Sequence, residues 1–395
     1  MKRIRLEVIV APLCFGILSL FYTIGTLSFI QKDLPKNADF RWFYGVGMAY
    51  RIHGSEHGYD LDLAAKYQAE VAGLPEGTEM LFVPNHPPFV YPLMALLSNF
   101  EYGIAYQFNF ILSFLFFAPV LIVVFKMLKI NGWAGFYSVL MVIGLLLFEP
   151  FYVSVLKGQD TYLLYAGGLF LLCGWSLKKD WLAGMGLGLM LIRPQIALML
   201  ALPFLFSQRR IWWWFVVAAF ALALYSFAQV RLTGALGFFK ILLLSTDVDK
   251  TGMYNLAGLL FRWFPGLDSD SLRVIGWSVY AVGLITMCVW WGKAKALTHR
   301  HLVLAIVLSL FTAPYLHYHD LALLAVAILG LAVSGARADR LPVPRAAVFP
   351  ALASVMLLIA QFWDFTRFTI PYVVMAVLPI LAWRLKPRDE RETKP

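Results

Sequence analysis

Four polar clusters in an otherwise apolar chain hold the residue types that could carry out chemistry. A single carboxylate, Asp39, stands in the tripeptide Ala38-Asp39-Phe40. The other clusters combine basic, acidic and amide side chains in short motifs, which are Lys157-Gly158-Gln159-Asp160, Arg193-Pro194-Gln195 and His317-Tyr318-His319-Asp320. A positioned carboxylate can take the proton of a hydroxyl nucleophile. Fixed cations can stabilise the negative charge of a leaving group, so this set of residues fits group transfer from an anionic donor.

Each cluster also has a purely structural interpretation. Asp39 stands where a helix is expected to begin, and aspartate is a favoured N-cap residue; this role is compatible with that of a general base. The segment 157–160 has the glycine and the polar residues that any tight turn needs. Arg193 could pair two helices or extend its guanidinium toward water. The sequence alone leaves these alternatives open.

The histidine motif raises the question of a metal. His317, His319 and Asp320 are ligand types, but no further ligands follow at a recognisable spacing, and this pattern alone is weak. Contact with a substrate or phosphate and structural hydrogen bonding remain as alternatives. The three cysteines lie in apolar stretches and form no disulfide framework, at positions Cys14, Cys173 and Cys288. We therefore expect no metal and no other cofactor.

The elements that position these clusters must be membrane helices. Of the 395 residues, 61% are hydrophobic and 14% are charged, whereas soluble domains have about 45–50% apolar and about 25% charged residues. The mean hydropathy is +0.72. This composition excludes a secreted soluble enzyme, a disordered protein and a nucleic-acid-binding module. The net charge of +10 is then a signal of membrane topology rather than of nucleic-acid binding.

The apolar runs predict an all-α polytopic bundle of about twelve transmembrane segments. The first, residues 8–30, follows three basic residues and has no signal-peptide cleavage pattern, so we expect a retained span with a cytoplasmic N-terminus. Further runs cover 104–125, 133–155, 161–177, 211–230, 272–292, 302–316, 321–335, 346–362 and 369–383. The remaining two segments come from residues 181–207.

Residues 181–207 are predicted to form a short hairpin. As one straight span this segment would place Arg193 at the bilayer centre, at a cost of about 2.5–3.5 kcal/mol. It would also invert the topology downstream and reverse the positive-inside bias. A hairpin instead puts Arg193-Pro194 at a tip that faces a cavity open to the outside. We expect one integral-membrane domain over 1–384, a charged tail over 385–395 and both termini in the cytoplasm.

The first outer loop, about 31–103, is predicted to carry two amphipathic helices. One begins at Asp39 and ends at Gly54, with Trp42 and Tyr44 suited to the membrane interface. The second follows a proline-rich turn that contains His86, whose side chain we expect to be structural or solvated.

Several short motifs in this order resemble the GT-C superfamily, specifically glycosyltransferase family 87, which includes phosphatidylinositol-mannoside α-1,2-mannosyltransferases. The resemblance covers roughly residues 35–330. The motifs are Ala38-Asp39-Phe40, Gly54, Gly58-Tyr59-Asp60, Tyr91-Pro92, Gly158-Gln159-Asp160, Ala183-Gly184 through Gly188 to Arg193-Pro194-Gln195, and Ser309 through Pro314 to His317.

This resemblance implies a GT-C-like fold, a polyprenyl-phosphate-linked sugar donor and a glycolipid or glycan acceptor, with mannose as the family's usual sugar. The reaction would occur on the extracytoplasmic side of the plasma or inner membrane. Asp39 would correspond to the family's essential aspartate and act as general base, and one base facing one displacement predicts inversion. Binding of the donor phosphate is assigned to Arg193, His317, His319 and Lys157. Substrate binding is assigned to Gln159, Asp160, Gln195, Tyr59, Tyr91 and Asp320.

A transporter or a lipid or glycolipid flippase is the alternative from another class. Many transporters are built from two related halves, whereas this chain has no visible internal repeat and has one long outer loop after its first span. That asymmetry favours the enzyme.

Overall fold

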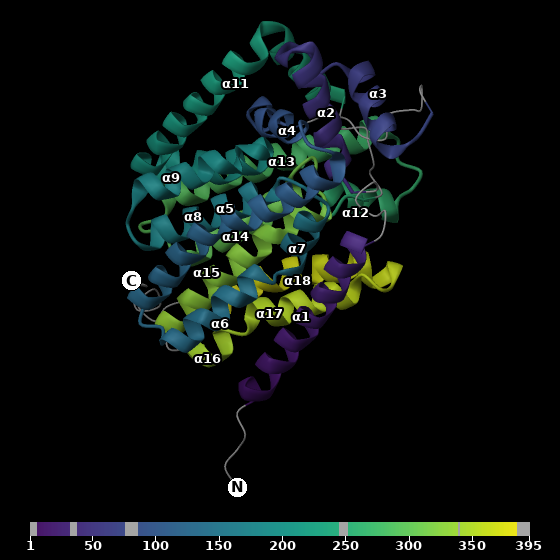
Figure 1. Cartoon of the computed structure of the whole chain (residues 1–395). Helices are drawn as coiled ribbons and strands as arrows, with labels where there is room; N and C mark the ends of the chain where they lie inside the picture. Colours follow the sequence, from purple (N-terminus) through teal and green to yellow (C-terminus); the bar gives the residue numbers. More distant parts are fainter. Residues whose placement is uncertain (1–5, 32–37, 76–85, 245–251, 339, 385–395) are drawn as a thin grey trace.

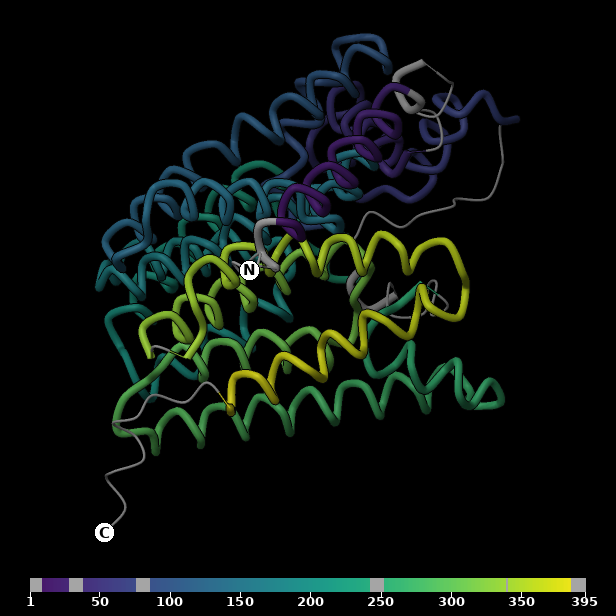
Figure 2. The backbone as a smooth tube through the Cα atoms, turned by 90° about the horizontal axis from the view of Figure 1, so that it is seen from below, coloured from purple at the N-terminus to yellow at the C-terminus, as the bar shows by residue number. Residues whose placement is uncertain are grey.

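The computed structural model describes residues 6–31, 38–75, 86–244, 252–338 and 340–384. Within these residues the chain forms α-helices and short 3-10 helices and no strand. The long helices lie side by side in a bundle, with the first-loop helices gathered at one end (Figures 1 and 2).

Seven of the described helical segments are long and apolar enough to cross a membrane, and a bent pair gives an eighth. The seven are α1 (Leu6–Gln31), α5 (Tyr102–Ile130), α11 (Arg209–Leu244), α13 (Ser269–Lys293), η7 (Tyr318–Ala322) with α15 (Leu323–Arg337), α16 (Val343–Ala346) with α17 (Phe349–Ala360), and α18 (Asp364–Arg384). The pair is α6 (Gly135–Leu146) and α7 (Glu149–Leu156), which bend by 46°. The chain is therefore a multi-pass membrane protein.

Four shorter apolar helices complete the bundle, α8 (Thr161–Ser176), α9 (Asp180–Leu189), α10 (Pro194–Ser207) and α14 (His299–Thr312). Each of the apolar runs predicted from the sequence coincides with one of these helices or helix pairs. How many of the short helices cross the membrane stays a prediction. The segment formed by η7 and α15 is buried along most of its length, as expected of a helix that is apolar all round.

Small residues bring α8, α9 and α11 into close contact. A Cβ on Gly174 of α8 would lie 2.4 Å from the backbone nitrogen of Ala183, and one on Gly184 of α9 would lie 2.3 Å from Cβ of Trp214. Glycine lets membrane helices approach this closely. The Ala183-Gly184 motif therefore has a packing role in the described structure.

The segment 181–207 folds back on itself, as predicted. Asp180, at the start of α9, and Gln208, just after α10, line the same cavity at one end of the bundle. The 3-10 helix η4 (Met190–Ile192) and Arg193 form the turn between the two arms. The tip lies inside the bundle, because Tyr280 in the middle of α13 donates to the carbonyl of Gln195 at 2.7 Å.

The first loop contains α2 (Phe40–His53), η2 (Ser55–His57), α3 (Leu61–Ala72), η3 (Pro88–Val90) and α4 (Tyr91–Leu97). The predicted limits of α2 are confirmed, and Gly54 ends it with φ 106°. The expected interface role of Tyr44 is wrong: its ring is buried by protein and its hydroxyl donates to the carbonyl of Phe100 at 2.7 Å.

The end of one predicted span also differs. The run 211–230 does not end in a loop, because α11 stays helical to Leu244 across a kink at Arg231 (φ 54°, ψ −166°). At the kink and beyond it the helix packs on the first loop, where Val230 and Ile241 share a hydrophobic cluster with Tyr59 and Tyr91. This apolar contact accounts for the longer helix. A short helix, α12 (Leu256–Trp263), precedes α13.

Candidate functional site

A tight turn between α7 and α8 organises the candidate site. Gly158 adopts φ 70°, and a Cβ there would lie 2.5 Å from Cβ of Phe40. The backbone nitrogen of Phe40 donates to the carbonyl of Lys157 at 2.8 Å. Glycine is needed both for the left-handed backbone and for this close approach. The turn is thereby fixed against the start of α2.

This contact brings Asp39 and Gln159 together. Nε2 of Gln159 donates to Oδ2 of Asp39 at 2.7 Å, across 120 residues of sequence. Asp39 stands at the N-cap position of α2, but its carboxylate makes no capping hydrogen bond. Its side chain is partly exposed, whereas Gln159 is buried. The carboxylate is therefore oriented by an amide donor rather than by the helix end.

The next residue of the turn, Asp160, belongs to a buried ionic group that we call the arginine cluster, made up of His86, Asp160, Arg193, His319 and Asp320. Nε of Arg193 donates to Oδ1 of Asp320 at 3.1 Å, and Nη1 lies 3.6 Å from Oδ1 of Asp160. Nη2 of Arg193 lies 3.4 Å from Nε2 of His319. All five side chains are buried. One guanidinium thus faces two carboxylates.

His86 is the cluster member that sequence reasoning missed. Its Nδ1 lies 2.6 Å from Oδ2 of Asp160, a distance typical of a short hydrogen bond from an imidazole N–H to a carboxylate. Nη1 of Arg193 lies 3.1 Å from the same nitrogen. The expectation of a structural role is met, but the alternative of a solvated side chain is wrong. Its position between Asn85 and two prolines was the available sign of a rigidly held histidine.

Tyr59 contacts the backbone of His86, and Tyr91 packs on Tyr59. The hydroxyl of Tyr59 donates to the carbonyl of His86 at 2.7 Å, and the Tyr59 and Tyr91 ring centroids lie 5.3 Å apart. Burial raises the pKa of Tyr59 well above its usual value, so this phenol remains a donor at neutral pH. In the described structure Tyr59 therefore holds the backbone of His86, and Tyr91 packs against Tyr59.

The histidine motif and the hairpin tip meet at Tyr315. Nε2 of Gln195 donates to the carbonyl of Tyr315 at 3.1 Å, and the Tyr315 hydroxyl lies 2.6 Å from Nε2 of His317. The backbone nitrogen of His317 donates to Oδ2 of Asp320 at 3.1 Å. His317 is only partly buried, in contrast to His319. Among the described residues no group of three or more His, Cys, Asp or Glu side chains is arranged to hold a metal ion.

The geometry joins the four sequence clusters into one site. Gln159 contacts Asp39 and its neighbour Asp160 contacts Arg193, and the Cα atoms of adjacent residues lie about 3.8 Å apart. Oε1 of Gln159 and Oδ1 of Asp160 are buried acceptors without a hydrogen-bond partner among the described residues. Such acceptors can receive hydroxyl groups of a ligand. Lys157 is the exposed cation beside them.

Comparison with known protein families gives a match over the central part of the chain. A sequence model of glycosyltransferase family 87 matches residues 85–314, which is more than half of the chain and includes His86, the turn at 157–160 and Arg193. Asp39 precedes the matched region, and His317 and Asp320 follow it. No curated protein and no solved structure matches the chain.

The match favours the enzyme over the transporter or flippase. The family match covers most of a multi-pass helical bundle. Carboxylates, amides and cations cluster at one end of that bundle. The chain belongs to glycosyltransferase family 87 and is a membrane-embedded glycosyltransferase.

Proposed function

We propose that this glycosyltransferase moves a sugar, with mannose as the first candidate, from a polyprenyl-phosphate donor to a hydroxyl of a glycolipid or glycan acceptor. The observation that carries the proposal is the 2.7 Å contact between Gln159 and Asp39 beside the arginine cluster. An oriented carboxylate, acceptors that have no hydrogen-bond partner among the described residues and a neighbouring cation thus occur in one place. Transfer from an anionic lipid donor requires these three elements.

Asp39 is the proposed general base. Gln159 occupies Oδ2, and Oδ1 has no hydrogen-bond partner within the described residues. Oδ1 takes the proton of the acceptor hydroxyl while that oxygen attacks the anomeric carbon. The bond from the anomeric carbon to the phosphate oxygen breaks, and its electron pair stays on the lipid phosphate. A single displacement of this kind inverts the anomeric carbon.

The leaving phosphate needs a positive group that is not already neutralised. Arg193 faces both Asp160 and Asp320, so these carboxylates offset its charge and would repel a phosphate. Lys157 is exposed and acts electrostatically on His319. We therefore give Lys157 the electrostatic contact with phosphate and place the partly exposed His317 beside it as a further polar contact. Arg193 and His319 hold the wall of the site together.

The site is proposed to face the extracytoplasmic side of the plasma or inner membrane, with both termini in the cytoplasm. The opposite end of the bundle exposes many cations, which are Lys126, Lys129, Lys178, Lys179, Arg209, Arg210, Lys293 and Lys295. Lysine and arginine of short loops concentrate on the cytoplasmic side of membrane proteins.

A donor screen tests this function. The purified chain in nanodiscs is given a panel of polyprenyl-phosphate hexoses and pentoses, with nucleotide sugars as the alternative donors, and products are identified by mass spectrometry. We expect transfer from a polyprenyl-phosphate sugar and none from nucleotide sugars. Transfer from a nucleotide sugar alone would contradict the proposal.

A further inference from the structure

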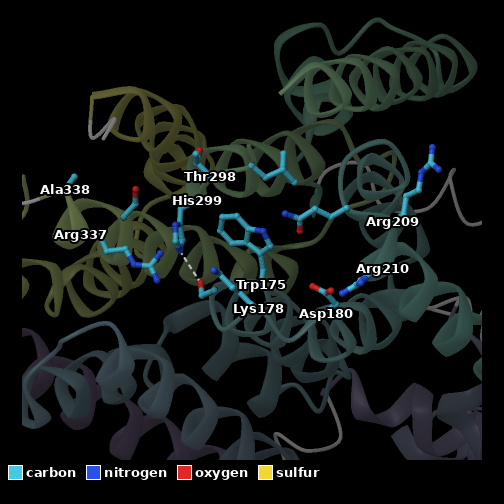
Figure 3. Close-up of a pocket in the computed structure, with 13 residues that line it drawn as sticks. Trp175, Lys178, Asp180, Arg209, Arg210, Thr298, His299, Arg337 and Ala338 are labelled. Carbon is cyan, nitrogen blue, oxygen red and sulfur yellow. Dashed lines mark hydrogen bonds between the residues drawn. The ribbon is translucent and has the colours of Figure 1, made fainter. Parts of the chain in front are cut away.

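A large basic cavity lies at the end of the bundle opposite the arginine cluster (Figure 3). Its volume is about 930 Å³, and its wall comes from the α8–α9 and α10–α11 junctions, the start of α14 and the end of α15. Four cations line it, which are Lys178, Arg209, Arg210 and Arg337, against one carboxylate, Asp180. The cavity is therefore electropositive.

Three of these four cations have no partner among the described residues. The side chains of Lys178, Arg209 and Arg210 make no ion pair and no hydrogen bond within the described part of the chain. Nε of Arg337 donates to Oδ1 of Asn131 at 2.7 Å, which adds no negative charge. Like charges gathered around a cavity repel one another unless an anion joins them.

Three helices begin at the cavity and add to its positive potential. Asp180, Arg209 and His299 are the first residues of α9, α11 and α14 and all line it. Helix N-termini present unpaired backbone N–H groups and a positive dipole end. The site thus combines side-chain cations with backbone donors, which is the combination that phosphate groups favour.

Contacts within the protein hold part of the cavity wall in place. His299 is buried, and its Nε2 lies 3.2 Å from Oγ of Ser176. Its ring packs edge-to-face with Trp175, and the two ring centroids lie 4.8 Å apart. Figure 3 shows Lys178 and Arg337 turned toward this histidine, whereas Arg209 extends away toward the rim. Side chains that are held by protein contacts lose little conformational freedom when a ligand binds.

Exposed tryptophans beside the cavity indicate that it lies near the membrane surface. Trp181, Trp213 and Trp214 are 51%, 62% and 44% exposed, and they follow the lining residues Asp180 and Arg210 closely in sequence. Exposed tryptophans of membrane proteins gather at the interface where phosphate headgroups lie. Basic pockets between membrane helices hold anionic headgroups.

We propose that this cavity binds a phosphate group, carried by an anionic phospholipid headgroup or by a soluble phosphate compound. The site is separate from Asp39 and the arginine cluster, and it does not depend on the identity of the sugar donor. Lys178 and Arg210 supply the charge, and the start of α9, which has no side-chain cap, supplies backbone donors.

A binding experiment tests the proposal with two probes. The full chain in phosphatidylcholine nanodiscs is titrated with phosphatidic acid, and separately with inorganic pyrophosphate. The test variant is Lys178→Gln/Arg210→Gln. The matched control, Lys293→Gln/Lys295→Gln, removes the same charge from exposed residues at the same end that do not line the cavity.

We expect at least one probe to bind the wild type, and the test variant to raise its Kd about tenfold or more, since each lost charged hydrogen bond is worth a large factor. The control should change the Kd less than about threefold, as surface charges do. Binding of phosphatidic acid alone identifies a lipid site, and binding of pyrophosphate as well identifies a site open to soluble phosphates.

A second variant covers the case in which the double substitution fails to fold. Ala338 lines the cavity and is partly exposed, so Ala338→Glu adds a negative charge without removing a contact of the basic side chains. It should weaken binding of the same probe. Absence of binding of both probes to the wild type, or an equal loss in the Lys293→Gln/Lys295→Gln control, would overturn the proposal.

Discussion

Replacing Arg193 tests whether this residue stabilises the arginine cluster or binds the donor phosphate. In the structure its guanidinium lies 3.1 Å from Asp320 and 3.6 Å from Asp160, whose side chains are 0% and 1% exposed. Arg193→Met keeps most of the side-chain length but leaves two carboxylates buried without a cation. Breaking a buried ion pair on one side costs about 3–5 kcal/mol. We therefore expect a loss of folding stability of this size.

The assay is the free energy of unfolding in mixed micelles titrated with sodium dodecyl sulfate, measured beside the rate of sugar transfer. Adding Asp320→Asn to Arg193→Met removes one unpaired charge, so it should recover about 1–3 kcal/mol. If Arg193→Met stays within about 1 kcal/mol of the wild type and only raises the KM for donor, Arg193 is a phosphate ligand and our account of the cluster is wrong.

Two further predictions concern the turn and the topology. Gly158→Ala places a methyl 2.5 Å from Cβ of Phe40 at φ 70°, so it should lower the free energy of unfolding by about 1–3 kcal/mol and reduce the rate of transfer. The control Gly103→Ala, which has no atom within 4 Å of the new methyl, should change neither quantity. Unfolding and transfer assays on both variants check this, and equal behaviour of the two variants would contradict it. In a background without native cysteines, Lys157→Cys should react with an impermeant maleimide from outside intact cells and Arg210→Cys only after the membrane is opened; the reverse pattern would invert the proposed orientation.

The order of the membrane helices could be predicted because membrane spans are governed by hydropathy. The segments around α8, α13 and α18 were found from apolar runs alone. The distribution of positive charges along the chain predicted the hairpin at Arg193. The kink of α11 at Arg231 was not predictable, since no proline or glycine marks that residue. The kink lies where α11 contacts the first loop, and hydropathy does not reveal that tertiary contact.

The members of the site could be predicted more readily than their partners. Asp39, Gln159 and Arg193 were chosen as polar residues at span ends, and the structure brings them together. That the arginine charge is shared between two carboxylates follows only from packing, because Asp160 and Asp320 are far apart in sequence. His86 was given a structural or solvated role for the same reason, since its contact with Asp160 is formed by distant segments.

The rate of sugar transfer by the Asp39→Asn variant tests the central claim most directly. Asparagine keeps the size of the side chain but cannot accept a proton, so the first-turnover rate with saturating donor should fall about 10²–10⁴-fold. The control is Asp268→Asn, because Asp268 caps α13 through Ser271 and asparagine caps equally well. We predict wild-type transfer by the control and near-complete loss by Asp39→Asn with unchanged folding. Retention of most of the wild-type rate by Asp39→Asn would contradict the assignment of Asp39 as the base.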